Sequence, residues 1–100
     1  MKHILLVCNA GMSTSLLVKK MQNEASAQNL DVEIEAKSLT EAKKNLGEAN
    51  CILIGPQIRY ELNNVKALAG NVPVDAINMQ DYGLVNGKKV LEAALKLMGE

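Results

Sequence analysis

HILLVCNAGMSTSLL, residues 3–17, is the stretch that decides how this chain folds. Its first six residues form a continuous apolar run, as expected of a strand buried on both faces of a parallel sheet. Small residues at 9–13 then form a turn, and a helical pattern begins near Ser13. A buried strand that turns directly into a helix predicts the first half of a βαβ unit.

Three further strand patterns follow, at 31–37, 51–55 and 73–77. The strands at 3–8 and 51–55 are apolar throughout, which favours the interior of the sheet. The strand at 31–37 alternates apolar and charged residues, and the one at 73–77 contains a proline, so both are predicted to lie at the edges. With right-handed crossovers, the simplest strand order is 2-1-3-4.

Helical patterns separate these strands. Ser38 and Glu41 have the spacing of a capping box, which predicts a short helix with Gly47 as its stop. Another helix follows Pro56, and the last helix spans about 86–98. The fold class is therefore α/β, a three-layer sandwich with helices on both faces of a four-stranded parallel sheet. The helical side chains predicted to face the core are Leu17, Val18, Met21 and Ala25, then Ile58, Leu62, Val65 and Leu68 or Ala69, and finally Leu91, Ala94, Leu95 and Met98.

Cys8 ends the first strand, and the strand order places it at the switch point between strands one and three, where ligands bind beyond the carboxyl ends of the strands. The helix that begins near Ser13 directs its unpaired N–H groups and the positive end of its dipole toward the same place. Gly11 permits a tight turn, and the hydroxyl groups of Ser13, Thr14 and Ser15 can cap the helix or donate to an anion. This setting favours the thiolate, which is the nucleophilic form of cysteine.

Composition excludes several classes of function. The chain has 100 residues, no net charge and two aromatic side chains, so it lacks the basic field and the stacking rings of a nucleic-acid reader. No apolar run approaches a membrane span, and the N-terminus is interpreted as a strand rather than a signal peptide. We therefore expect one cytoplasmic domain, residues 1–100, without direct membrane insertion, cofactor or metal, in which Cys8 and Cys51 are thiols.

The residues alone leave three functions open: a phosphoryl carrier, a small cysteine-dependent hydrolase, and a regulatory module that binds an anion without covalent chemistry. The strand, loop and helix around Cys8 resemble the low-molecular-weight tyrosine phosphatases. Those enzymes carry an arginine six positions after the nucleophile, where this chain has Thr14, and its sole arginine is Arg59. His3 lies at the far end of the first strand, and Cys51 is predicted to be core. A site that accepts phosphate and hydrolyses it poorly suits a carrier.

Two motifs make the chain resemble a known family. CNAGMSTSLL, from Cys8 to Leu17, and IGPQIRY, from Ile54 to Tyr60, closely resemble the IIB component of the phosphoenolpyruvate-dependent sugar phosphotransferase system, lactose/cellobiose/chitobiose type. The resemblance implies that Cys8 is the catalytic residue and accepts phosphate from a histidine of enzyme IIA. It also implies that the phosphate passes to a sugar, such as cellobiose, chitobiose or lactose, which enters through the membrane permease enzyme IIC.

The resemblance further assigns the surroundings of Cys8. It implies a phosphate-binding loop made of Asn9, Ala10, Gly11, Met12, Ser13, Thr14 and Ser15. Gln57 and Tyr60 match the neighbouring loop, and Tyr82, which follows the fourth strand, is predicted to line the same rim. Arg59 is interpreted as a solvated charge at the start of a helix.

Overall fold

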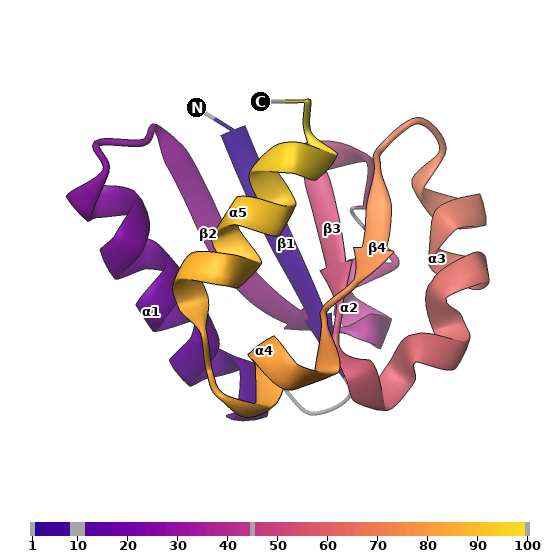
Figure 1. The fold of residues 1–100 in the computed structure, drawn as a ribbon. Coiled ribbons are helices and arrows are strands. Elements are labelled where there is room, and N and C mark those ends of the chain that lie inside the picture. Colours follow the sequence, from indigo (N-terminus) through magenta and orange to yellow (C-terminus); the bar gives the residue numbers. More distant parts are fainter. Residues whose placement is uncertain (1, 9–11, 45, 100) are drawn as a thin grey trace.

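The computed structural model describes residues 2–8, 12–44 and 46–99. Its strands are β1 (Lys2–Cys8), β2 (Val32–Ser38), β3 (Cys51–Ile54) and β4 (Val74–Ala76). They form a parallel sheet in the order β2-β1-β3-β4, as Figure 1 shows. The predicted fold class, the strand order and the placement of β2 and β4 at the edges are therefore confirmed.

β1 is the central element, because it pairs with β2 along one edge and with β3 along the other. Side chains alternate along a strand, so Ile4 and Leu6 contribute to the core on one face of the sheet while Leu5 and Val7 contribute to the core on the other. All four are buried. The continuous apolar run of β1 therefore reflects a strand that is covered on both faces.

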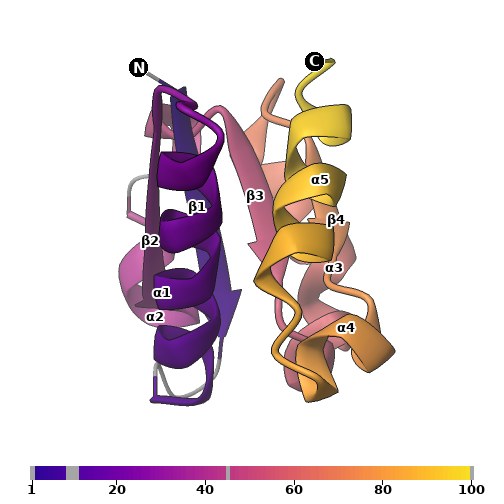
Figure 2. The same ribbon diagram turned by 60° about the vertical axis from the view of Figure 1, so that its left-hand side comes forward.

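Two long helices, α1 (Met12–Ala27) and α5 (Gly87–Leu97), pack against each other on one face of the sheet (Figures 1 and 2). α1 begins one residue before the predicted start. Leu95 and Met98 are partly buried against this layer. The helical pattern predicted the buried side chains of this layer correctly, namely Leu17, Val18, Met21, Ala25, Leu91 and Ala94.

Shorter elements cover the opposite face: α2 (Leu39–Ala42), the 3₁₀ segments η1 (Leu46–Glu48) and η2 (Pro56–Glu61), and α3 (Leu62–Ala69). The Ser38 cap is confirmed, because Ser38 Oγ accepts a hydrogen bond from the Glu41 backbone N–H at 3.3 Å. The predicted stop at Gly47 is wrong, since α2 already ends at Ala42 and Gly47 belongs to η1.

The predicted inward face of α3 is correct except at Leu68. Ile58 of η2 is buried, as are Val65 and Ala69 of α3, and Leu62 is partly buried. Leu68 is 56% exposed. The reason is geometric: consecutive residues lie about 100° apart around a helix, so turning Ala69 toward the sheet turns Leu68 toward solvent.

α4 (Met79–Gly83) is a short helix that the sequence pattern did not predict. Asn78 Oδ1 caps it by accepting hydrogen bonds from the backbone N–H groups of Gln80 (2.9 Å) and Asp81 (3.1 Å). Five residues are too few to display a helical period, although an asparagine at this position is a helix-start signal. The helix, which contains Tyr82, lies near the carboxyl edge of the sheet (Figure 1).

Gly87 marks a close approach of α5 to α1. A Cβ atom at Gly87 would lie 2.7 Å from the carbonyl carbon of Lys20 and 2.8 Å from the backbone nitrogen of Met21. Backbone atoms cannot rotate aside, so α1 and α5 would have to separate. We predict that Gly87→Ala lowers the free energy of unfolding by about 1–3 kcal/mol, measured by urea denaturation.

Gly83→Ala is the matched control for this substitution. Within the described part of the chain, no neighbouring atom lies within 4 Å of a Cβ added there. The control should change the free energy of unfolding by less than about 1 kcal/mol. Equal losses in the two variants would contradict the close helix contact.

Candidate functional site

Cys8 is the last residue of β1, at the carboxyl edge where β1 and β3 end side by side. The Gly55 N–H donates to the Val7 carbonyl at 2.8 Å, which extends the β1–β3 pairing by one residue. A Cβ atom at Gly55 would lie 3.6 Å from Cys8 Cβ and 3.1 Å from Gln57 Oε1. The side chains of Cys8 and Gln57 therefore flank the same point above Gly55.

The Cys8 side chain is 1% exposed, so its sulfur is not open to solvent in this conformation. The sequence predicts a nucleophile beside an anion cradle, and in the structure the Cys8 side chain is buried. A phosphoryl group can reach the sulfur only after the sulfur becomes exposed. Burial at the end of a strand does not by itself distinguish a reactive cysteine from a packing residue.

The predicted phosphate loop is only partly described. Asn9, Ala10 and Gly11 lie outside the described residues, as do the side chains of Met12, Ser13 and Thr14. The backbone of α1 begins at Met12, and Ser15 is exposed in its first turn. The N-terminus of a sixteen-residue helix thus follows Cys8 after three residues, which is the arrangement that favours a bound anion.

The three predicted rim residues lie on two elements at the same edge of the sheet. Gln57 and Tyr60 belong to η2, and Tyr60 is 77% exposed. Tyr82 belongs to α4, where it is partly buried against the core layer of α1 and α5. Gln57 lies next to Cys8 through Gly55. Arg59 is exposed on η2 and lines a groove beside β4.

The other residues considered for chemistry lie elsewhere. Cys51, at the beginning of β3, is 0% exposed and belongs to the core layer of α1 and α5. His3 lies near the start of β1, and its Nε2 is 3.1 Å from Glu35 Oε1, a contact that lacks hydrogen-bond geometry. Neither residue is near the carboxyl end of β1, because β1 and β3 are parallel.

Two negative findings apply to the described ranges. No group of three or more histidine, cysteine, aspartate or glutamate side chains there could hold a metal ion. Within the same ranges, no helix has the length and apolar character needed to cross a bilayer.

Sequence comparison identifies close relatives along nearly the whole chain. The family model described as "PTS system, Lactose/Cellobiose specific IIB subunit" matches residues 3–93. The chain is 43% identical over 100 residues to the oligo-beta-mannoside-specific EIIB component of Bacillus subtilis (strain 168), covering 98% of this chain and 97% of that protein. It is 46% identical over 104 residues to the galactose-specific EIIB component of Lactococcus lactis subsp. cremoris (strain MG1363), covering 97% and 96%.

Comparison with solved structures also finds IIB components. The solution structure of the cellobiose-specific phosphotransferase IIB component from Borrelia burgdorferi superposes with a TM-score of 0.81 at 35% identity, covering 98% of this chain and 92% of that one. The lactose-specific IIB component domain from Streptococcus pneumoniae superposes with a TM-score of 0.86, covering 95% of each chain. At 17% identity, this second match shows the fold alone.

The buried Cys51 thiol makes stability depend on pH in the alkaline range. Burial raises the pKa of this thiol from its ordinary value of 9.0 to about 12, and the negative charge of Asp75 adds to the rise. Between these values the folded protein keeps a proton that the unfolded chain has lost, so stability falls as pH rises. We predict that this group alone contributes a loss of up to about 1.4 kcal/mol per pH unit.

Cys51→Ala isolates this contribution from the other groups that titrate in the same range. Urea unfolding of both proteins from about pH 8 to about pH 11 should show the wild type losing stability more steeply than the variant. The constant difference caused by the lost sulfur does not affect the slopes. Parallel pH dependences would contradict the assigned cause.

Proposed function

This chain belongs to the lactose/cellobiose-specific IIB family of the phosphoenolpyruvate-dependent sugar phosphotransferase system, and we propose that Cys8 carries its phosphoryl group. As a IIB component, the chain is a phosphotransferase. The observation that carries the proposal is the position of Cys8. It ends the central strand at the β1–β3 switch point, and three residues separate it from the N-terminus of α1.

The proposed reaction has two transfer steps. The Cys8 thiolate attacks the phosphorus of a phosphohistidine on enzyme IIA, so an S–P bond forms while the N–P bond breaks and the electron pair returns to the imidazole. A sugar hydroxyl then attacks the phosphocysteine. An O–P bond forms, the S–P bond breaks, the hydroxyl proton is released, and the thiolate is restored.

Residues 9–15 would hold the phosphoryl group during these steps. Backbone N–H groups of the loop and of the first turn of α1 would donate to its oxygens, and the helix dipole would stabilise the negative charge. Ser13, Thr14 and Ser15 supply hydroxyl donors. Since Cys8 is buried, docking of a partner must expose its sulfur, and burial afterwards would exclude water from the phosphocysteine.

The remaining assignments follow from this function. Residues 1–100 act as one IIB domain in the cytoplasm, with enzyme IIA as donor and the sugar permease enzyme IIC as the membrane partner. The domain neither inserts into the membrane nor binds nucleic acid, and it uses no cofactor. Gln57, Tyr60 and Tyr82 form the rim that these partners meet, and the acceptor is a β-linked disaccharide of the cellobiose, chitobiose or lactose class.

The two other functions have weaker support. A phosphatase needs a guanidinium at the phosphate, and the sole arginine, Arg59, lies on η2 beside β4 rather than within residues 9–15. A regulatory module that binds an anion without covalent chemistry would keep its full effect in Cys8→Ser. We expect the opposite in a reconstituted transport assay, where Cys8→Ser should abolish sugar phosphorylation.

Mass spectrometry of the intact protein tests the carrier directly. After incubation with phosphorylated enzyme IIA, we predict a mass increase of one phosphoryl group on the wild type and none on Cys8→Ala. Cys51→Ala is the matched control and should be labelled like the wild type, because Cys51 is buried away from the site. A phosphoryl group on Cys51 together with an unmodified Cys8 would refute the proposal.

Thr14→Arg tests why this chain stores phosphate rather than hydrolysing it. A guanidinium six residues after Cys8 would bind the phosphoryl oxygens and stabilise the charge that develops during hydrolysis. We predict that the phosphocysteine decays roughly tenfold faster, or more, in Thr14→Arg than in the wild type, followed by loss of the adduct mass with time. Thr14→Lys, which lacks the forked geometry, should have a smaller effect. A longer-lived adduct in Thr14→Arg would contradict this explanation.

A further inference from the structure

Gly55 is a buried residue that lies beside Cys8 at the end of the neighbouring strand. It directly follows Ile54, the last residue of β3, and its N–H donates to the Val7 carbonyl at 2.8 Å. A Cβ atom added at Gly55 would lie 3.6 Å from Cys8 Cβ, which is an ordinary contact distance between two side chains. A side chain at position 55 would therefore be in contact with the proposed phosphoryl carrier.

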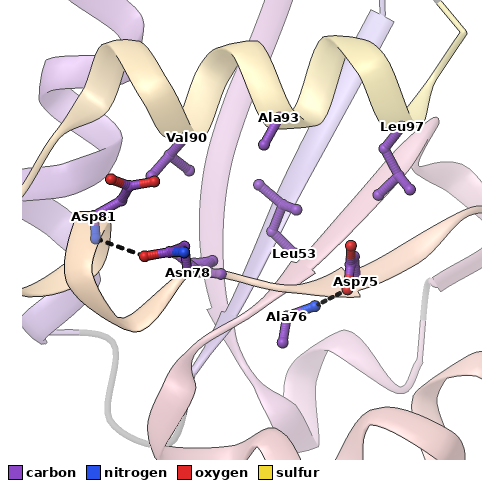
Figure 3. A pocket seen from close by; sticks show the side chains of 9 residues that line it. Leu53, Asp75, Ala76, Asn78, Asp81, Val90, Ala93 and Leu97 are labelled. Carbon is purple, nitrogen blue, oxygen red and sulfur yellow. Dashed lines mark hydrogen bonds between the residues drawn. The ribbon is translucent and has the colours of Figure 1, made fainter.

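The missing side chain would point to the face of the sheet that α1 and α5 cover. Side chains alternate along a strand, so residue 55 faces the same way as Leu53, which belongs to the core layer of these two helices. Figure 3 shows Leu53 directed toward α5, where it lines a cavity of about 40 Å³. By the same alternation, Cys8 shares its direction with Ile4 and Leu6 of that layer. A side chain at position 55 would thus lie on the same face as the Cys8 sulfur and α1.

The backbone at Gly55 does not require a glycine. Its φ of −60° and ψ of 147° are values that any residue adopts, and they suit a residue that precedes a proline, here Pro56. Alanine would keep both backbone hydrogen bonds, because the N–H donates to Val7 and the carbonyl accepts from the Ile58 N–H at 3.1 Å. Gly70 is different, since its φ of 65° lies in the left-handed region where a Cβ atom causes strain.

Packing against the described residues does not require a glycine either. A Cβ atom at position 55 would lie 3.5 Å from the Val7 carbonyl oxygen, an ordinary contact, and 3.1 Å from Gln57 Oε1. The shorter distance is to the end of an exposed and flexible side chain, which can move aside. At Gly87, by contrast, the nearest atoms belong to the backbone of α1. Neither conformation nor these contacts explain why position 55 has no side chain.

We propose that Gly55 is a positioning residue, which leaves room beside Cys8 for the phosphoryl group. This inference rests on the proposed function, because it requires a phosphocysteine. The phosphorus bonded to the Cys8 sulfur brings its oxygen atoms to the face that α1 covers, where N–H groups of the first turn of α1 would bind them. A methyl group in contact with Cys8 Cβ would occupy part of that volume or turn the sulfur away from α1. Gly55 is buried, so it acts on the transferred group rather than on the surface that partners meet.

The substitution Gly55→Ala tests this inference through a rate and a stability. With phosphorylated enzyme IIA at varied concentration, followed by time-resolved mass spectrometry of the intact protein, we expect the maximal rate of phosphorylation to fall about tenfold or more, because small displacements of reacting atoms are costly. The enzyme IIA concentration that gives half of this rate should stay the same. The urea midpoint should shift by less than about 0.5 M, because alanine fits the backbone and restricts the unfolded chain.

Gly47→Ala is the matched control for this substitution. Gly47 is exposed in η1, which precedes β3 and is therefore at the opposite end of that strand from Gly55. Within the described ranges, no neighbouring atom lies within 4 Å of a Cβ added there. This variant should accept phosphate like the wild type.

A double variant separates an effect on Cys8 from an effect on Gln57, since a methyl group at position 55 would contact both side chains. If the methyl group acts on Cys8, Gly55→Ala should lower the maximal rate by a similar factor in the wild type and in a Gln57→Ala background. If it acts only by displacing Gln57, the substitution should cause no further loss in that background. The second result would overturn the inference.

Three other results would overturn it as well. A wild-type rate in Gly55→Ala would show that the space is not needed, and a urea midpoint lowered by more than about 0.5 M would assign the glycine to packing. A higher half-saturating concentration of enzyme IIA at an unchanged maximal rate would assign it to docking. Each of these leaves the carrier intact as long as the wild type gains its phosphoryl group on Cys8. A wild type that gains none there would refute the carrier, and this inference with it.

Discussion

Pairing of β1 along both of its edges is the constraint on which the rest of the structure depends. β2 lies beside all seven residues of β1, and β3 pairs with residues 4–7 of it. This pairing satisfies the backbone of a strand whose side chains are buried on both faces. It also aligns the carboxyl ends of β1 and β3. The bond from the Gly55 N–H to the Val7 carbonyl continues the alignment and brings the η2 loop next to Cys8.

The two cysteines show how position in this sheet controls chemistry. Cys8 and Cys51 are both buried, and both lie on interior strands. Cys51 begins β3 within the core layer of α1 and α5, where burial and the charge of Asp75 keep its thiol protonated. Cys8 is the last residue of β1, and the next element along the chain is the long helix α1, which begins with its N-terminus near the end of β1. The same residue type is therefore a packing group at one end of the sheet and the proposed phosphoryl carrier at the other.

The carboxyl edge is built from short elements, and this makes it suitable for partners. η2 and α4 flank the edge and carry the exposed side chains of Tyr60 and Met79, and the exposed Leu84 directly follows α4. Asn78 is essential to this arrangement, because its side chain starts α4 directly after β4. The burial of Cys8 in this conformation fits a carrier that must avoid hydrolysis, provided that partner docking exposes the sulfur.

Local sequence pattern by itself determined the element types of the long segments, the parallel sheet and its strand order. Each of these depends on residues within one segment: the apolar run of β1, the alternation of β2 and the helical spacing of α1 and α5. Elements that are too short to show a helical periodicity could not be predicted in this way. The sequence pattern therefore did not predict α4, and it predicted the wrong end for α2. The loop at Asn9, Ala10 and Gly11 was predicted from sequence and lies outside the described residues, so it stays a prediction.

Tertiary structure decided everything that depends on segments meeting across the fold. The burial of Cys8, its position beside Gly55 and the approach of Gly87 to α1 have no signature in any single segment. The same holds for the groove beside β4, because Arg59 and residues 75–80 become neighbours only where β3 and β4 pair. The physical reason is that periodicity reports which face of an element is buried, whereas contacts between loops depend on how the packed elements end.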